Sequence, residues 1–324
     1  MKKEGTPVIF ELGLNHMGNE DRAFRMVNEL KSQGARKITI QVLTDIASLT
    51  RNTATINSLK NYCLSFNQNL KVIKYAASRG LMVGATVLDP AMVDTLISAG
   101  VKFFKVLSGD LTFNLLINKL STTGLPVYLS TGASTIAEIA KAIEEWRVNV
   151  TNNGLLHLIH TVLVVPTPPE LLNLRNISEL SNLFGLPVAY GQHSDIAIAI
   201  ELAIAAGAQE IFVYVAEKKH PELPDGPNAI ECSQASTLIK RVQTSIKMMG
   251  CSERVISVQE ANARTSARRS IIAARKIDKD QILNEEDIDF KRPRTGLDCW
   301  DLPLILGKKT HKTFDLGEDL TMLK

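Results

Sequence analysis

The sequence predicts an α/β protein: a (β/α)8 TIM barrel followed by a small C-terminal domain. Two observations carry this prediction. Eight short apolar runs recur over the first 250 residues, and amphipathic segments separate them. Each run is apolar throughout rather than alternating, which is typical of parallel strands buried on both faces. An open, doubly wound sheet remains the alternative, because a sequence does not show whether a sheet closes.

The expected strands, in order, are residues 7–13, 37–43, 81–87, 101–107, 125–130, 155–161, 186–191 and 210–216. The segments between them have helical periodicity. In the first of these, apolar Phe24, Met26, Val27 and Leu30 precede Gly34, which is expected to end the helix. The same order of helix, glycine and strand recurs before residues 101–107 and 210–216.

The domain organisation follows from chain length, because single cores stop growing near about 250 to 300 residues. We expect a barrel domain at 1–250, a polar linker at 251–268 and a separate module at 269–324. The module is too short for a large core of its own. Docking on the barrel, or on a partner chain, would stabilise it.

Composition limits the class of protein and its partners. The chain has 37 basic and 34 acidic residues, a net charge of +3, and the charges are interspersed rather than gathered in a basic block. Nucleic acid and anionic membranes are therefore not expected as partners. No apolar run approaches the roughly 18 residues that span a bilayer, and no apolar leader opens the chain, so a cytoplasmic protein is expected.

The four cysteines, Cys63, Cys232, Cys251 and Cys299, stand far apart without a C-x-x-C pair. This spacing argues against both a zinc knuckle and a disulfide framework. We expect reduced, structural thiols.

Polar residues end most of the expected strands, where the chemistry of a barrel is found. They are Glu11, Asn15, Thr39, Gln41, Thr86, Lys105, Ser108, Asp110, Ser130, Thr131, His160, Gln192 and His193. We expect all of them to face one cavity. Glu11 lies in an apolar strand and requires a partner there, and Lys105 is expected to share its cavity.

Two strand ends favour a small anion. The stretch FKVLSGD supplies the charge of Lys105 and the donors of a Ser-Gly turn, a combination suited to phosphate or carboxylate. The stretch LSTGAS repeats the pattern, with Ser134 as the expected helix N-cap. His193 also ends a strand, one strand after His160, which leaves metal binding and proton transfer both open.

Several stretches resemble one known family. They are ELGLNHMGN, AGVKFFKVLSGD, PVYLSTGAS, VPTPPELLNLRNI and GLPVAYGQHSD in the barrel, with RRSIIAARKIDKDQILNEEDIDFKRPRTG and LGKK in the C-terminal module. In these stretches the chain resembles the sialic acid synthases, the N-acetylneuraminate and related nonulosonate synthases. The likeness covers nearly the whole chain in the family's order.

The resemblance implies a barrel joined to a C-terminal antifreeze-like (SAF) domain, which reaches over the partner's active site in a swapped homodimer. It implies condensation of phosphoenolpyruvate with an open-chain N-acetylated amino sugar, giving a nonulosonic acid and phosphate by C–O cleavage. A divalent metal, Mn²⁺ or Mg²⁺, would activate the sugar aldehyde as a Lewis acid.

The resemblance also implies roles for individual residues. Glu11 and Lys105 would be catalytic, Glu11 as the acid or base. Phosphoenolpyruvate would lie on Thr86, Lys105, Ser108, Asp110 and Ser130; the sugar on Gln41 and Arg292; the metal on His193 and Tyr214.

The chain departs from the family pattern at six places, one of which is Asp110 in place of the glutamate of S-G-E. Thr39 replaces the lysine of K-x-Q, Gly191 and Gln192 replace the serine and aspartate of S-D-H, and Tyr214 replaces the second metal histidine. Leu163 and Val165 replace an asparagine and a tyrosine, and residues 226–229 read Gly-Pro-Asn-Ala instead of G-P-D-H. Thr39, in place of a lysine, removes one cationic contact. Tyrosine, with a pKa near 10, is also a poor ligand for these metals.

Three hypotheses follow. The first is a divergent synthase of this family. The second is a catalytically impaired paralogue with a binding or regulatory role, which the missing lysine and histidine favour. The third is an aldolase-like barrel in which Lys105 forms a Schiff base.

Overall fold

The computed structural model describes residues 7–148, 150 and 155–322, and the chain falls into two compact units that divide between Gly250 and Cys251. The first unit contains the eight strands expected from the sequence. The second contains the C-terminal module together with the segment predicted as a linker.

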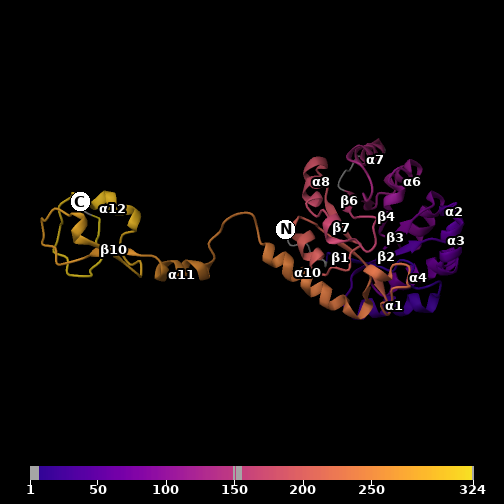
Figure 1. The fold of residues 1–324 in the computed structure, drawn as a ribbon, viewed down its shortest axis with the longest axis horizontal. Coiled ribbons are helices and arrows are strands. Elements are labelled where there is room, and N and C mark those ends of the chain that lie inside the picture. Colours follow the sequence, from indigo (N-terminus) through magenta and orange to yellow (C-terminus); the bar gives the residue numbers. More distant parts are fainter. Residues whose placement is uncertain (1–6, 149, 151–154, 323–324) are drawn as a thin grey trace. The chain divides into compact units, whose positions relative to one another are not determined.

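Eight parallel strands close into a barrel in the first unit (Figure 1). They are β1 (Val8–Glu11), β2 (Lys37–Val42), β3 (Met82–Val87), β4 (Phe103–Val106), β5 (Val127–Ser130), β6 (Leu156–His160), β7 (Val188–Gln192) and β8 (Ile211–Ala216). Each pairs with the next along the chain, and β1 also pairs with β8. The predicted barrel is confirmed and the open sheet is excluded. A two-residue strand, β9 (Ile230–Glu231), adds to β8.

Helices surround this ring and cover its outer face (Figure 1). They are α1 (Glu20–Ser32), α2 (Ile46–Leu49), α3 (Thr53–Leu59), α4 (Phe66–Ser78), α5 (Val93–Ser98), α6 (Asn114–Ser121), α7 (Ile136–Val148), α8 (Asn176–Phe184), α9 (Ile198–Ala205) and α10 (Ala235–Met249). Helix α1 follows its sequence prediction. Its N-cap Asn19 accepts the Arg22 N–H at 2.8 Å, its apolar side packs on the barrel, and Gly34 turns the chain at φ +88°.

Strand alternation sorts the side chains of the barrel into two sets. One set faces the helices and forms the main core; the other faces the barrel axis. The axial set forms an apolar plug of Ile9, Phe103, Tyr128, Ile159, Ala189 and Phe212. Gly84 makes room for it, because a Cβ there would lie 2.2 Å from the Phe103 ring. Because the plug fills the axis of the barrel, polar groups on the axial face lie above or below it.

A polar network closes the amino end of the plug. Tyr128 meets Phe103 and Phe212 edge to face, at centroid distances of 5.5 and 5.1 Å, and donates its hydroxyl to the Glu210 carboxylate. The Lys37 ammonium pairs with the same carboxylate at 2.5 Å. Glu210 therefore ties β2 and β5 to the start of β8.

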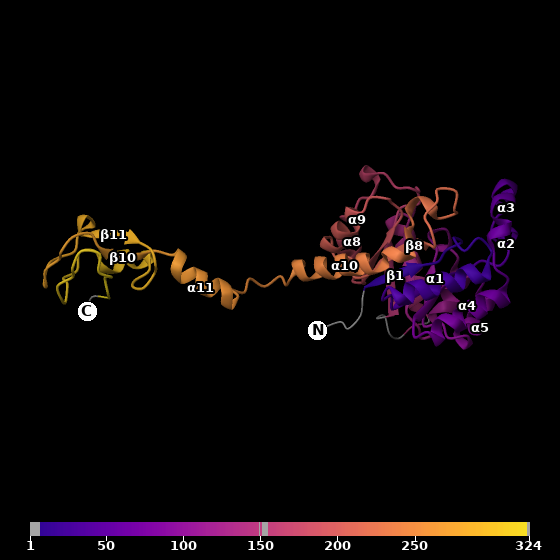
Figure 2. The ribbon, with the colours of Figure 1, turned by 90° about the horizontal axis from the view of Figure 1, so that it is seen from below.

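The opposite, carboxyl end carries the segment with α2 and α3. In Figure 2 this segment rises from the end of the barrel where the loop after β8 also emerges. Leu14, Leu43 and Ile46 form a small apolar cluster that fixes it to the loops after β1 and β2. Gly18 allows the closest contact, because a Cβ there would lie 2.4 Å from the Asn61 carbonyl oxygen.

The second unit has a core of its own. Strands β10 (Ser270–Ala273) and β11 (Ile288–Lys291) pair antiparallel, and α12 (Leu302–Ile305) packs with them. The core consists of Ile271, Ala273, Ile277, Leu283, Ile305, Phe314 and Leu320. The segment expected as an irregular linker instead contains a helix, α11 (Val258–Ala267), exposed along its length. In the part of the chain that the structure describes, no helix is long and apolar enough to cross a membrane.

Substituting Glu210 tests the network at the amino end. Glu210→Ala leaves the Tyr128 hydroxyl and the Lys37 ammonium without their shared acceptor. We expect the free energy of unfolding to fall by about 2 kcal/mol, less than a fully buried pair would lose, because Lys37 is partly exposed. Urea unfolding is followed through buried Trp146 in a Trp300→Phe background, since Trp300 lies exposed in the second unit.

Glu144→Ala on the outside of α7 is the control, because Glu144 is exposed and its loss should change stability by less than about 0.5 kcal/mol. Equal stabilities for the two variants would show that the network does not stabilise the barrel.

Candidate active site at the carboxyl end of the barrel

An ion pair between Glu11 and Lys105 lies above the apolar plug. The two residues occupy the next axial positions on β1 and β4 after Ile9 and Phe103. The Lys105 ammonium lies 2.5 Å from the Glu11 carboxylate, and the side chains are 5% and 4% exposed. The two residues that the sequence analysis placed together are therefore direct partners of opposite charge. Two charges so far from water are tolerable only because each neutralises the other.

Aromatic side chains from β8 line the same space. The Lys105 nitrogen lies 5.2 Å from the Phe212 ring centroid and 5.6 Å from that of Tyr214. Tyr214 is the register partner of Glu11, and its ring lies 6.0 Å from the His193 ring, centroid to centroid. Glu11, Lys105, His193 and Tyr214 therefore converge at one rim of the barrel.

His193 presents a neutral imidazole to this rim. Burial lowers its pKa, and the Lys105 ammonium lowers it further. Its Nδ1 lies 2.6 Å from the Val162 carbonyl oxygen, a contact in which Nδ1 must carry the hydrogen. Nε2 is then left with a free lone pair, which can accept a hydrogen bond or bind a metal.

Asp225, in the loop after β8, lies on the side of the rim that His193 and Tyr214 form, which we call the acceptor side because the acceptor sugar is expected there. Sequence reasoning missed this residue. Its carboxylate accepts the Leu14 N–H at 3.1 Å, and its own N–H donates to Asn15 at 3.0 Å. Burial raises the pKa of Asp225 to about 6, and the Glu11 carboxylate adds to this shift against the opposing Leu14 N–H. The stretch LPDGPN carries only turn signals, so the sequence gives no sign that its aspartate folds back over β1.

Gly13 makes this arrangement possible. Its φ of +52° suits glycine, and a Cβ there would lie 2.3 Å from an Asp225 oxygen and 2.9 Å from the Tyr214 ring. The absence of a side chain at Gly13 therefore lets the β8 side of the rim close on the end of β1.

The residues expected to hold an anion lie on the other side of Lys105. Thr86 is the register partner of both Lys105 and Gln41. The Ser108 hydroxyl accepts the Gly132 N–H at 3.0 Å. Two polar atoms of this set, Ser130 Oγ and Asp110 Oδ2, are buried with no hydrogen-bond partner among the described residues. Burial raises the pKa of Asp110. Unpaired buried polar atoms indicate a place that a ligand or water would fill.

Three sequence predictions need correction. His160 and Gln192 do not face the axis: His160 Nε2 lies 2.8 Å from the Leu172 carbonyl, and the Gln192 amide donates to the Ser194 carbonyl at 2.7 Å. Both residues are offset by one position from axial neighbours on their strands, and a strand reverses face at each residue. Ser134 is not the cap of α7; Thr135 accepts the Glu138 N–H instead.

Arg292 lies in the second unit, where it is exposed beside β11. Its predicted contact with the sugar stays a prediction.

The donor set at the rim does not fit the divalent cation expected from the resemblance. His193 offers one suitable nitrogen, but Glu11 is paired with Lys105, and a lysine ammonium faces the site. Burial, with the Glu11 and Asp225 carboxylates nearby, raises the pKa of Tyr214 well above its ordinary value, which keeps the phenol protonated. Across residues 7–148, 150 and 155–322 there is no cluster of three His, Cys, Asp or Glu side chains that could hold a metal.

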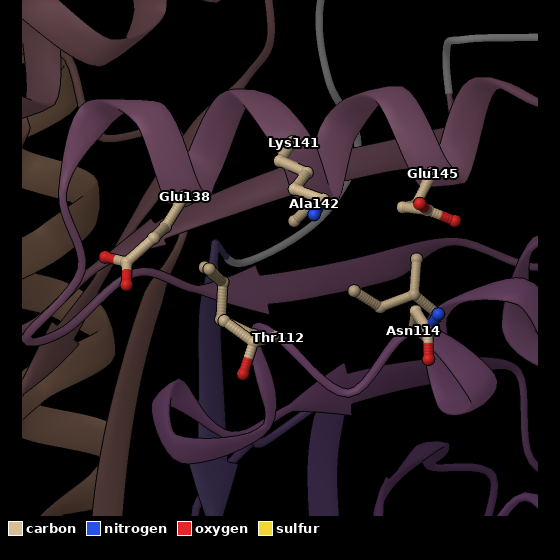
Figure 3. A pocket seen from close by; sticks show the side chains of 8 residues that line it. Thr112, Asn114, Glu138, Lys141, Ala142 and Glu145 are labelled. Carbon is tan, nitrogen blue, oxygen red and sulfur yellow. The ribbon is translucent and has the colours of Figure 1, made fainter.

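Two cavities of the barrel unit lie away from this rim. One, of about 370 Å³, lies between α6 and α7; Figure 3 shows Glu138, Lys141 and Glu145 on one helix opposite Thr112 and Asn114. The other, of about 1090 Å³, lies between α7 and α8 and includes the outward-facing His160. Neither cavity is lined by Glu11 or Lys105, so neither is the site of the predicted chemistry.

Comparison with known proteins identifies relatives of the whole chain. The model of the NeuB family matches residues 44–254. The uncharacterized protein MJ1065 of Methanocaldococcus jannaschii is 34% identical over 310 residues, which are 95% of this chain and 91% of that protein. The N,N'-diacetyllegionaminic acid synthase of Legionella pneumophila is 27% identical over 97% of this chain and 92% of its own.

A solved structure supports the fold. The putative spore coat polysaccharide biosynthesis protein E of Chromobacterium violaceum superposes with a TM-score of 0.81 at 19% identity, covering 97% of both chains. Because the family model matches well over half of the chain and one relative exceeds 30% identity over nearly all of it, this protein belongs to the NeuB family.

Proposed function

We propose that this protein is a synthase that condenses phosphoenolpyruvate with an open-chain N-acetylated amino sugar to give a nonulosonic acid and phosphate. The observation that carries the proposal is the buried Glu11–Lys105 pair, at the end of the barrel where β5 ends in Ser130 and β4 leads to Asp110, both with an unpaired buried polar atom. The relative of this chain in Legionella pneumophila is named as a synthase of such an acid.

The reaction balances with one water. C3 of phosphoenolpyruvate bonds to the aldehyde carbon, and the carbonyl oxygen takes a proton. Water adds at C2, and the C–O bond to phosphate breaks to leave a ketone. The enzyme must therefore bind a small anion, orient an aldehyde above it, deliver a proton to the carbonyl oxygen and take one from the attacking water.

Lys105 suits the binding of the small anion, and Glu11 suits the transfer of protons. An entering phosphate or carboxylate would compete with Glu11 for the Lys105 ammonium, because each is an anion seeking the same donor. Glu11 would thereby lose its partner at the moment the substrate arrives. A carboxylate released in this way is a base held within reach of the reacting atoms.

The paired state of Lys105 counts against the Schiff-base hypothesis. Within its ion pair Lys105 is an ammonium group, and an ammonium nitrogen has no lone pair with which to attack a carbonyl. The impaired-paralogue hypothesis keeps a specific observation in its favour, since Thr39 and Tyr214 stand where the family has a lysine and a histidine.

The proposal also includes the residues that bind the sugar. We assign Gln41 and Tyr214 to the sugar, since Gln41 shares the register partner Thr86 with Lys105 and the Tyr214 ring lies 5.6 Å from the Lys105 nitrogen. We also propose that the second unit is an SAF-type domain whose Arg292 reaches the sugar from the partner chain of a swapped homodimer. That assignment rests on the stretch KRPRTG and on the exposure of Arg292.

Phosphate release tests the proposed reaction. We expect purified protein to release phosphate only when phosphoenolpyruvate and one member of a panel of N-acetylated hexosamines are both present. Glu201→Gln, on the outer helix α9, should retain the rate, while Glu11→Gln should lower kcat about 100-fold or more, because a general acid or base is lost. Absence of phosphate release with every sugar would favour the impaired paralogue.

A double variant separates the role of Lys105 in binding from its role in folding. Lys105→Met leaves the Glu11 charge buried and alone, and should cost about 3 kcal/mol of stability. Adding Glu11→Gln removes that charge and should restore most of the loss, without restoring affinity for phosphoenolpyruvate. Calorimetry of phosphoenolpyruvate binding and urea unfolding give the two readouts. If the double variant binds phosphoenolpyruvate as tightly as the wild type, Lys105 does not hold the anion.

Gly13→Ala tests the contact that closes the acceptor side. The added Cβ would overlap Asp225 and Tyr214, so we expect both to shift and KM for the sugar to rise. Gly34→Ala is the matched control, because Gly34 also has a positive φ but has nothing within 4 Å of an added Cβ. Both variants pay the backbone cost of about 1 kcal/mol, and only Gly13→Ala should change KM. Equal KM values would remove Gly13 from the site.

A further inference from the structure

The rim of the barrel poses a chemical problem that the proposed function leaves open. When C3 of an enol attacks an aldehyde, the carbonyl π pair moves onto oxygen, and a charge develops there that must be stabilised. A divalent metal would do this in a site with two histidines. In this chain the second histidine position holds Tyr214, and the donor set does not fit a metal.

We propose that Tyr214 itself activates the aldehyde, by donating its hydroxyl hydrogen to the carbonyl oxygen in place of a divalent metal. This inference rests on the proposed condensation and names the catalytic residue that would stabilise its developing alkoxide. The hydroxyl passes its proton to that oxygen as the C–C bond forms and regains one from water, so the step needs no further reactant.

The position of Tyr214 meets the geometric requirement. It lies on the axial face of β8, in register with Glu11, and its ring is 5.6 Å from the Lys105 nitrogen. The residue is 7% exposed, and no hydrogen bond joins its hydroxyl to another described residue. A buried phenol without a hydrogen-bond partner is a donor available to a ligand.

The neighbours of Tyr214 cannot perform this task. The His193 Nδ1–H is used by the Val162 carbonyl, so the imidazole offers the site only a lone pair. The Lys105 ammonium is engaged by Glu11, and in the proposed function it passes to the substrate anion. An ordinary phenol carries its proton at neutral pH, since its pKa is near 10. Tyr214 is thus a neutral donor, next to His193 and Lys105, that is available on the acceptor side of the rim.

The packing of Tyr214 also explains how its ring is oriented. One ring edge approaches Gly13, where a side chain would collide with it, and the His193 ring tilts against it at 34°. A donor whose ring is fixed before the substrate arrives needs little reorganisation during the reaction. Loss of one such preorganised donor typically lowers kcat about 100- to 1000-fold.

The experiment combines metal binding with kinetics on the full-length chain. Protein treated with EDTA is titrated with Mn²⁺ alone and followed by electron paramagnetic resonance, and phosphate release is measured with and without EDTA. We expect the wild type to bind no stoichiometric Mn²⁺ and to keep its rate in EDTA. Tyr214→Phe should lower kcat about 100-fold while leaving KM for phosphoenolpyruvate unchanged.

Two further variants sharpen the result. Tyr190→Phe is the control, because Tyr190 is also a buried tyrosine with an unpaired hydroxyl but lies on the outer face of β7. It should retain full activity. Tyr214→His places a second imidazole beside His193 and should create Mn²⁺ binding that the wild type lacks.

The inference is overturned if the wild type binds Mn²⁺ at one tight site, if EDTA abolishes its activity, or if Tyr214→Phe keeps its full rate in EDTA. Failure of the proposed function has a different signature, namely no phosphate release with any sugar. In that case the Mn²⁺ titration still decides whether the rim is metal-free. Binding of Mn²⁺ by the wild type would refute a metal-free rim, and no binding would support it.

Discussion

The Glu11–Lys105 ion pair is the interaction around which the site is organised. The apolar plug beneath it excludes water, so neither charge could remain there without the other. The same low polarity strengthens the electrostatic influence of the pair on its surroundings. It contributes to the lowered pKa of His193 and to the raised pKa of Asp225, although burial is the larger cause for both. Burial therefore dominates the pKa of both rim groups, and the Glu11 and Lys105 charges shift each pKa in opposite directions.

The strands and the central residues of the site were predictable from sequence, because buried parallel strands give continuous apolar runs. A charged residue within such a run must meet an opposite charge, which identified Glu11 and Lys105. The faces of the strand ends were not predictable in the same way. His160 and Gln192 stand one residue from axial positions, and an apolar run without alternation does not indicate which residues face the axis.

Residues brought to the site by loops were also beyond prediction. Asp225 reaches the rim through a turn that returns to the end of β1, a long-range contact with no local signature. Helix α11 was missed for a different reason. Its sequence, VQEANARTSA, is rich in good helix formers, but it has no buried face to produce the apolar periodicity by which helices are recognised. Local propensity and the Ser257 cap account for it.

The substitutions at the rim become consistent when its charges are considered together. A site with a divalent metal has the positive charge of the metal in addition to that of its lysines, and a lysine on β2 would add one more cation. With Thr39 on β2 and Tyr214 on β8, Lys105 is the strand cation at the carboxyl end of the plug, while Lys37 pairs with Glu210 at the amino end. In the proposed reaction, anion binding draws Lys105 from Glu11, so substrate entry and release of the base become one event. A neutral donor such as the Tyr214 phenol fits this balance, because it stabilises a developing alkoxide without competing with Lys105 for the anion. In the proposed reaction, Thr39 and Tyr214 therefore have compatible roles: the rim would bind the anion with Lys105 and the aldehyde with the neutral Tyr214 phenol.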